Sequence, residues 1–281
     1  MPTTNSFYEL LTTREREIDS LLCVGLDPVI EKLPKGFSAD ANGVAEFIIE
    51  IINATSDFAA SFKPNLPFYL NLGDDGPRVL KRIREAIPAH IPMVLDCKVN
   101  DLGETAKAWV ETGFDFIQAD AMVVSPYMGE DALAPYFGRA GKGAIVLVKT
   151  SNPGSGDLQD LQLENGRPLY MHVAERCREW DGQYPSDIGM VVGATYPEQL
   201  QAVRELCPDQ VILLPGLGAQ GGDVAASVRA GVDKNGGALM CSSSRGILYA
   251  SSGNDFAEAA RSSAQQLRDE INLHRRESAI A

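Results

Sequence analysis

The chain has 281 residues, of which 44% are hydrophobic and 22% are charged, the composition of an ordinary globular protein with a large core. Its net charge of -13 argues against general nucleic-acid binding, because binding to phosphate backbones needs clustered Lys and Arg. This charge does not exclude a small anionic ligand held by a few local cations. The length fits one large barrel or two small domains.

The cellular location is predicted from the amino terminus and the cysteines. No apolar run approaches membrane-spanning length, and residues 1–5 lack the basic and apolar regions of a signal peptide. The cysteines are odd in number, and none lies in a Cys-x-x-Cys pair. We expect free thiols in a reducing cytosol, and thus a cytoplasmic protein without membrane or nucleic-acid partners. These residues are Cys23, Cys97, Cys177, Cys207 and Cys241.

Short apolar runs alternate with segments of helical spacing from one end of the chain to the other. The predicted strands cover residues 21–26, 58–62, 91–95, 121–124, 144–148, 188–192, 210–214 and 238–241. The predicted helices cover residues 43–53, 77–87, 104–111, 169–180, 197–207 and 256–274. The fourth strand is the weakest of these predictions, because the apolar run just before it also fits a helix end.

Strands and helices in this alternation predict a single (β/α)₈ barrel domain over residues 1–281, and the length is close to the typical size of that fold. A doubly wound open sheet is the competing architecture. That fold normally has a Gly-rich turn after its first strand, whereas Gly25-Leu26-Asp27-Pro28 stands here. The sequence therefore favours the barrel.

The longest irregular stretch covers residues 151–168. It contains Asn152-Pro153-Gly154-Ser155-Gly156 and, further on, Glu164-Asn165-Gly166-Arg167-Pro168. A loop of this length in a compact domain is usually functional and often covers an active site. The alternative is a simple surface insertion, because surface loops tolerate added length well.

Two carboxylates and a lysine gather at the end of the third predicted strand, in Asp96-Cys97-Lys98-Val99-Asn100-Asp101. Side chains alternate across a strand, so Asp96 and Lys98 should project to the same side. Asp101 follows closely enough to approach the same ammonium group. This arrangement is unfavourable in a core and common in an active site. The alternative is a surface ion pair, which contributes little.

Barrel active sites form at the carboxyl ends of the strands, so polar residues at those ends should converge. Nearly every predicted strand ends in groups that can bind or transfer charge. In chain order they are Asp27; Lys63 and Asn65; Asp96, Lys98 and Asp101; Ser125 and Tyr127; Lys149, Thr150, Ser151 and Asn152; Pro215, Gly216, Gly218, Gln220, Gly221 and Gly222; and Ser242, Ser243, Ser244 and Arg245.

The last two of these loops predict a phosphate site. Glycines expose backbone amides, and the amino terminus of a following helix adds partial positive charge. Phosphate sites after strands seven and eight recur in barrels. Arg245 supplies a planar bidentate donor, with Gln220 as a neutral donor beside it. The turn Gly216-x-Gly218 is weak evidence alone, but together with Arg245 one strand later it predicts a binding site for a phosphate monoester.

Histidine chemistry is not expected, because His90, His172 and His274 all lie away from the predicted strand ends. No nucleotide-cofactor fingerprint is present either. The chemistry thus falls to Lys and Asp. With two carboxylates nearby, Lys98 should stay protonated and act as an acid rather than as an amine nucleophile. The aspartates would repel a carboxylate of the substrate, while the ammonium group of a lysine lies beside it. This arrangement favours loss of carbon dioxide and protonation of the carbanion that remains.

These residues together resemble the orotidine 5′-phosphate decarboxylase family. The matching elements follow the family order over most of the chain. They are Leu26-Asp27, Lys63, Asp96-x-Lys98-x-x-Asp101 with Thr105, Ser151-Asn152-Pro153-Gly154, Gly216-Leu217-Gly218-Ala219-Gln220-Gly221-Gly222 and Ser244-Arg245-Gly246. The longer bacterial branch of the family is most similar, because it carries a loop such as that from Lys149 to Ser155 and a later Asn-Gly-Arg-Pro-Leu segment.

The resemblance implies decarboxylation of orotidine 5′-phosphate to uridine 5′-phosphate in pyrimidine synthesis, without a cofactor or metal. Lys63, Asp96, Lys98 and Asp101 would form a charged tetrad in which Lys98 protonates C6 of the pyrimidine. The protein would be a homodimer with active sites at the interface, where the partner subunit lends the equivalents of Asp101 and Thr105. The other implied substrate contacts are Asp27 to the ribose, Ser151 to the pyrimidine edge, and Pro215, Gly216, Gly218, Gln220, Gly221, Ser244 and Arg245 around the phosphate.

Three alternatives remain. The magnesium-dependent 3-keto-gulonate 6-phosphate decarboxylases and hexulose-phosphate synthases share the Asp-x-Lys-x-x-Asp signature, but they have an acidic metal ligand where this chain has Lys63. A lysine there would oppose a divalent cation. A catalytically silent sugar-phosphate-binding barrel would need Gln220 and Arg245 but not the tetrad. A protein-interaction scaffold would have an exposed apolar patch.

Overall fold

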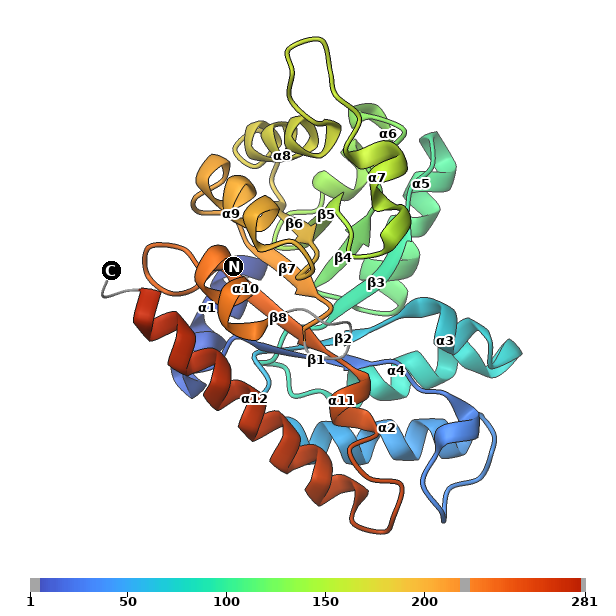
Figure 1. Ribbon diagram of the computed structural model, residues 1–281. Coiled ribbons are helices and arrows are strands. Elements are labelled where there is room, and N and C mark those ends of the chain that lie inside the picture. The colour runs from blue at the N-terminus through green and yellow to red at the C-terminus, as the bar shows by residue number, and fades with distance from the viewer. Residues whose placement is uncertain (1–5, 218–222, 279–281) are drawn as a thin grey trace.

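A computed structural model of the chain describes residues 6–217 and 223–278 and has eight parallel strands that form a barrel (Figure 1). The strands follow the order β2-β1-β8-β7-β6-β5-β4-β3, and single bridges from Phe62 to Met93 and from Asn65 to Asp96 join β2 to β3. The predicted (β/α)₈ barrel is therefore confirmed. The strands are β1 (Leu22–Leu26), β2 (Ser61–Pro64), β3 (Val94–Val99), β4 (Ala121–Val124), β5 (Gly143–Lys149), β6 (Asp187–Val192), β7 (Ile212–Pro215) and β8 (Leu239–Ser243).

Helices surround the ring of strands, and each of the predicted helices is present with small shifts at its ends (Figure 1). A π-helical segment, Glu111–Phe116, continues α5. In the described ranges, no helix combines the length and the apolar character needed to cross a membrane. The helices are α1 (Phe7–Ile18), α2 (Ala41–Thr55), α3 (Leu66–Leu70), α4 (Gly76–Ala86), α5 (Gly103–Val110), α6 (Glu130–Phe137), α7 (Gly156–Gln159), α8 (Leu169–Trp180), α9 (Pro197–Leu206), α10 (Val224–Gly231), α11 (Arg245–Leu248) and α12 (Phe256–Ser278).

The strands are buried on both faces, which explains why they appear in the sequence as continuous apolar runs rather than as alternating patterns. One core lies between the strands and the helices. A second, smaller core holds side chains from alternate strand positions, among them Val94, Ala121, Val123, Ile145, Leu213 and Met240.

Helix α1 covers the amino-terminal end of the barrel. Its first turn is fixed by a capping box in which Ser6 and Glu9 satisfy each other's backbone N–H groups. Phe7 and Leu11, both buried, pack into the smaller core from this side, and burial of each contributes about 1.5–3 kcal/mol. The space inside the barrel is thus filled from the amino-terminal end.

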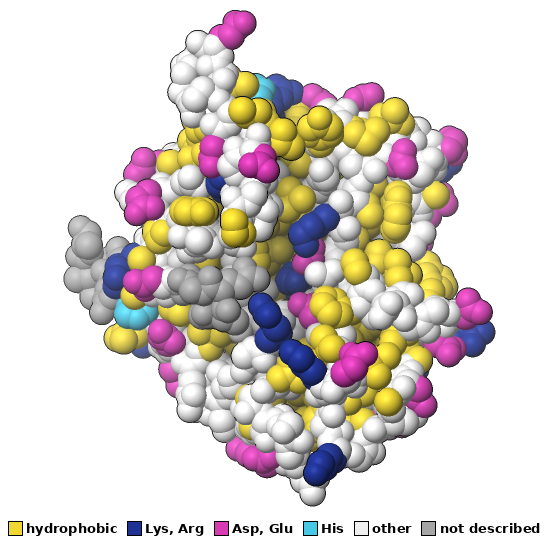
Figure 2. All heavy atoms as spheres, turned by 45° about the vertical axis from the view of Figure 1, so that its right-hand side comes forward, with side chains coloured by type: hydrophobic (Ala, Val, Ile, Leu, Met, Phe, Trp, Pro, Cys, Tyr) yellow, Lys and Arg dark blue, Asp and Glu magenta, His cyan; other side chains and the backbone are white. Residues whose placement is uncertain are grey.

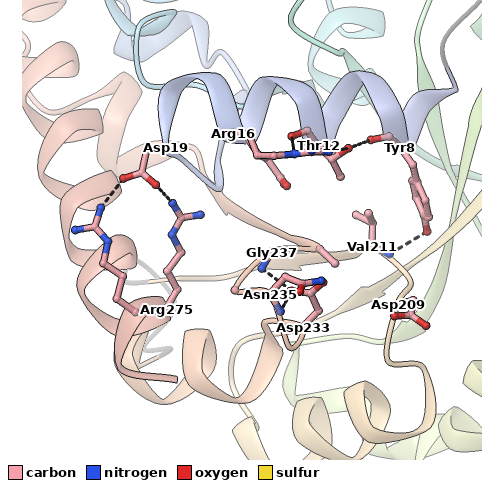
Figure 3. Close-up of a pocket in the computed structure, with 14 residues that line it drawn as sticks. Tyr8, Thr12, Arg16, Asp19, Asp209, Val211, Asp233, Asn235, Gly237 and Arg275 are labelled. Atoms are coloured by element: carbon pink, nitrogen blue, oxygen red, sulfur yellow. Dashed lines mark hydrogen bonds and ion pairs between the residues drawn. The ribbon is translucent and has the colours of Figure 1, made fainter. Parts of the chain in front are cut away.

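A polar cavity of about 650 Å³ lies beside α1 at this same end of the barrel (Figure 3). Its charged groups are largely engaged with one another. Asp19 accepts hydrogen bonds from Arg275 and Arg276 of α12, and Asp233 accepts from the backbone N–H groups of Asn235 and Gly237. Because barrel chemistry takes place at the opposite end of the strands, we do not assign the active site to this cavity.

The second strand begins later than predicted. Residues 58–62 were expected to form it, but β2 is Ser61–Pro64. The backbone N–H groups of Phe58 and Ala59 donate to the carbonyl of Thr55, so these residues continue the turn that ends α2. As a result, Lys63 lies within the strand rather than after it.

The stretch 151–168 is less irregular than predicted. It contains a 3₁₀ turn, Pro153–Ser155, followed directly by α7. A bridge between Gln162 and Pro168 closes its second half. The stretch is therefore a folded excursion of the chain between β5 and α8.

Candidate active site

A cavity of about 870 Å³ opens at the carboxyl ends of the strands. Figure 2 shows a hollow in which Lys and Arg side chains gather beside Asp and Glu, with hydrophobic side chains around it. The predicted site residues that line the cavity are Asp27, Lys63, Asp96, Lys98, Ser151, Pro215, Gly216, Ser244 and Arg245. They come from six strand ends that are far apart in the sequence.

One carboxylate holds two lysines at the bottom of this cavity. The ammonium of Lys63 donates to Oδ2 of Asp96 at 2.9 Å, and the ammonium of Lys98 donates to Oδ1. Lys63 and Asp96 are buried, whereas the side chain of Lys98 is 45% exposed. Lys98 is therefore the most accessible member of the trio.

The opposite charges of Asp96 and Lys63 determine the protonation state of each side chain. Burial would raise the pKa of Asp96, but Lys63 and Lys98 outweigh it and hold the pKa below its ordinary value. Burial would also lower the pKa of Lys63, but the carboxylates of Asp96 and Asp27 raise it above its ordinary value. Near neutral pH, Asp96 is thus an anion and Lys63 a cation.

The backbone of β3 is distorted where it carries Lys98. The pairing of β3 with β4 shifts between Leu95 and Val99, and Lys98 has a φ of 50°, in the left-handed region that non-glycine residues rarely adopt. The strand therefore extends past its predicted end at residue 95. Cys97 points away and donates to the carbonyl of Val123 at 3.3 Å. Its burial raises the pKa of Cys97 to about 12, so this thiol is not a nucleophile.

Asp27 lines the cavity and has one carboxylate oxygen without a partner among the described residues. Its Oδ2 accepts a hydrogen bond from the hydroxyl of Ser244 at 2.6 Å, while its buried Oδ1 has no partner among the described residues. Gly25 makes this contact possible, because a Cβ at that position would lie 1.8 Å from the Ser244 oxygen. An unpaired carboxylate oxygen of this kind suits a ligand hydroxyl.

The predicted phosphate end of the cavity contains Pro215, Gly216 and Arg245. Arg245 is exposed, and its guanidinium forms no hydrogen bond or ion pair with any other residue in the described part of the chain. It is therefore available to an anionic ligand. The remaining predicted phosphate residues, Gly218, Gln220, Gly221 and Gly222, lie outside the described residues.

Asp101 does not reach Lys98 within one chain, contrary to the expectation from their spacing. Its carboxylate accepts from the backbone N–H of Leu102 at 2.8 Å, and no ion pair joins it to Lys98 in the described ranges. The reason is that the chain turns away after β3, where Asn100 donates to the carbonyl of Ser125 at 2.6 Å. Asp101 is absent from the lining of the main cavity.

Thr105 also lies outside the main cavity. It lines an apolar groove of about 320 Å³ formed by α3, α4, α5 and the π-helical segment. The groove contains Leu70 and Phe116, both about half exposed. The site residues predicted from the first part of α5 thus face a different surface in the single chain.

Thr195 and Tyr196 were missed by the sequence reasoning. Both follow β6 and line the main cavity, and the hydroxyl of Thr195 donates to the carbonyl of Ser151 at 3.4 Å. The signal was available, since these polar residues follow the sixth predicted strand, whose end was not considered. No histidine lines the part of the cavity that the structure describes.

Comparison with known proteins identifies the family of this chain. A model described as "Orotidine 5'-phosphate decarboxylase / HUMPS family" matches residues 20–261. The chain belongs to this family. It is 45% identical to the orotidine 5'-phosphate decarboxylase of Thermomicrobium roseum over 98% of both chains. It is 46% identical to that of Roseiflexus castenholzii, over 95% of this chain and 97% of the relative.

Solved structures agree with the fold and with the predicted branch of the family. The structure of Leishmania donovani OMP decarboxylase has a TM-score of 0.86 and 38% identity, and the match covers 96% of this chain and 99% of that one. The putative enzyme from Toxoplasma gondii has a TM-score of 0.91 and 36% identity, with 99% and 98% covered. The predicted resemblance to the longer branch is therefore confirmed.

Proposed function

We propose that this protein decarboxylates orotidine 5′-phosphate to uridine 5′-phosphate in pyrimidine biosynthesis. The observation that carries the proposal is the sharing of Asp96 between Lys63 and Lys98 in a cavity with an open cation, Arg245. A phosphate on Arg245 would place the rest of a nucleotide toward the charged trio. Full-length similarity to decarboxylases of this name supports the same substrate.

In the proposed reaction, the bond between C6 of the pyrimidine and its carboxylate breaks, and the electron pair stays on C6. Carbon dioxide leaves, and the ammonium of Lys98 gives a proton to C6. The anion of Asp96 repels the substrate carboxylate and keeps Lys98 protonated until that transfer. Lys63 holds Asp96 ionised from the buried side. The reaction needs no electron acceptor, because no oxidation takes place.

The rest of the cavity would position the nucleotide. The free Oδ1 of Asp27 suits a ribose hydroxyl, and Ser151 would contact the pyrimidine edge. The phosphate would lie on Arg245. The backbone of the loop after β7, with Ser244, would complete this end of the site, and the predicted contacts there are Pro215, Gly216, Gly218, Gln220 and Gly221.

We favour a metal-free reaction over that of the magnesium-dependent members of the family. Lys63 stands on β2 where those members are expected to have an acidic ligand. Its pKa is raised, so it is a cation, and it would repel a divalent ion at this position.

We also propose a homodimer in which each site is completed by Asp101 and Thr105 of the other copy. Thr105 lies in the apolar groove, where Leu70 and Phe116 are 51% and 49% exposed. Leu102, beside Asp101, is 51% exposed. An isologous interface over this face would bury these side chains and set the first turn of α5 against the second copy.

The dimer can be tested by complementation. Lys98→Ala and Asp101→Ala chains should each be inactive alone. When the two are unfolded and refolded together, mixed dimers should contain one intact site and regain activity. Failure to regain activity, with mixed dimers demonstrated by mass, would refute a shared site.

The reaction is tested by following the ultraviolet absorbance of orotidine 5′-phosphate after addition of the purified protein in excess EDTA. Conversion to uridine 5′-phosphate would support the substrate and the metal-free reaction. Lys98→Ala should abolish turnover, while Arg245→Ala should mainly raise KM. Activity on a sugar phosphate that returns with magnesium would move the assignment to the metal-dependent members. No activity in either assay would leave a phosphate-binding barrel.

We place the reaction in the cytoplasm. The five cysteines are all free thiols, and four of them are buried. This pattern is typical of a reducing compartment. Fractionation of cells with an antibody against the protein would test the location.

A further inference from the structure

Lys149, the last residue of β5, is a buried cation that belongs to no part of the charged trio. Its side chain is 1% exposed, and its ammonium donates to Oδ1 of Asp160 at 2.7 Å. The same ammonium lies 5.7 Å from the ring centre of Tyr170 and 5.8 Å from that of Tyr196. A lysine that is buried this completely requires a strong compensating interaction, because the loss of its hydration is energetically unfavourable.

The ion pair connects the two ends of a segment that carries a site residue. Asp160 follows α7, and between it and Lys149 lies Ser151, which lines the main cavity. A second link runs in parallel, because the backbone N–H of Thr150 donates to the side chain of Gln159 at 2.9 Å. The segment 149–160 is therefore a closed loop whose base is held by an ion pair and a hydrogen bond.

Ser151, in the closed loop, packs against the residues that follow β6. Gly193 follows that strand, and a Cβ at this position would lie 2.8 Å from the Cβ of Ser151. The carbonyl of Ser151 accepts from the hydroxyl of Thr195. The position of Ser151 is thus determined from one side by Gly193 and the Thr195 side chain and from the other by the loop.

Neither member of the ion pair can act on a ligand directly. Lys149 and Asp160 are both absent from the lining of the described part of the main cavity, although Tyr196, over which Lys149 lies, is present there. If the loop moved away, the ammonium of Lys149 would lose the carboxylate of Asp160, whose side chain is 43% exposed. The pair therefore favours the arrangement of the loop in which both charges are in contact.

We propose that Asp160 and Lys149 are positioning residues that hold Ser151 in place for the pyrimidine end of the substrate. This inference rests on the proposed function, because it assumes that Ser151 contacts the base. It assigns a role to two residues that lie outside the tetrad and the phosphate site. It also explains why the excursion 151–168 is folded rather than open.

The test is a double-mutant cycle between Asp160→Asn and Ser151→Ala, measured as kcat/KM for orotidine 5′-phosphate. In the native background, Asp160→Asn should lower kcat/KM by about 10- to 100-fold, since small displacements of a positioned group have effects of this size. Most of the loss should appear in KM. In the Ser151→Ala background, the same change should cost less than about threefold, because the group that it positions is already gone.

Asp157→Asn is the matched control. Asp157 is exposed on α7, the helix directly before Asp160, so the variant makes the same change of charge without touching Lys149, and its kcat/KM should equal that of the native protein. If Asp160→Asn does not fold, the double variant Lys149→Met/Asp160→Asn removes the unpaired charge and can replace it in the cycle.

The outcomes separate the two proposals. A native protein without activity on orotidine 5′-phosphate would refute the proposed function. A native protein that is active, with equal losses from Asp160→Asn in both backgrounds, would refute the positioning role and leave the proposed function intact. A loss confined to the background that retains Ser151 would support both.

Discussion

Replacement of Glu15 by Gln should make the protein more stable at alkaline pH, although it removes a charge. Glu15 lies on the buried side of α1, lines the polar cavity at the amino-terminal end and is 5% exposed. Its Oε1 has no hydrogen-bond partner in the described part of the chain. Burial, with a smaller effect of Asp233, raises the pKa of Glu15 from 4.5 to about 8, while Arg275 and Arg16 oppose the rise.

The sign of the pH dependence follows from proton binding. Between pH 4.5 and about 8 the folded protein keeps a proton on Glu15 that the unfolded chain has lost. Stability from this group therefore falls as pH rises through that window and is constant above it. A difference of one in pKa is equivalent to about 1.4 kcal/mol, so the native protein should lose about 3 to 5 kcal/mol across the window. Gln does not titrate and keeps a neutral side chain of the same shape.

The assay is urea unfolding of the native and Glu15→Gln proteins between pH 5 and 9. The difference in unfolding free energy should be near zero at pH 5 and should grow to about 3 to 5 kcal/mol in favour of the variant at pH 9. Other titrating groups cancel in this difference. Glu17→Gln, on the exposed side of the same helix, makes the same change of side chain and is the control. A flat difference for Glu15→Gln would refute the argument that burial holds its proton.

Two further predictions concern a close backbone approach and a buried cation. Gly25→Ala should displace the Ser244 hydroxyl from Asp27 and lower kcat/KM for orotidine 5′-phosphate by about tenfold or more. The control is Gly182→Ala, where a Cβ meets nothing within 4 Å, and its kcat/KM should not change. Unchanged kinetics in Gly25→Ala would contradict the role of the hydrogen bond between Ser244 and Asp27. Arg204→Met should lower the free energy of unfolding by about 3–5 kcal/mol in urea titrations. Arg204 is 7% exposed, and its guanidinium donates to five backbone carbonyls, of which that of Ala238 would keep a second donor in the N–H of Ile212. A loss below about 1 kcal/mol would show that the remaining carbonyls find other donors.

The sequence by itself determined the architecture and the types of group at the site. Strands buried on both faces form apolar runs, and helices form runs with helical spacing, so the alternation could be recognised without any contact between distant residues. Lys63, Asp96 and Lys98 could be assigned to one site because the carboxyl ends of parallel strands meet at one end of a barrel. These inferences depend on local periodicity and on a general rule of topology.

Only the tertiary structure decided how these groups pair. Asp96 contacts Lys63 across 33 positions of the chain, and it contacts Lys98 because a shifted register and a left-handed residue turn that side chain back. Asp101, three positions after Lys98, is directed elsewhere by the contact that Asn100 makes with the residue after β4. The burial of Lys149 could not be predicted from the sequence either, since it depends on Asp160 and on the rings of two tyrosines from later segments of the chain. The pairing of charged side chains depends on strand register and on packing between distant segments, and local sequence spacing does not determine either.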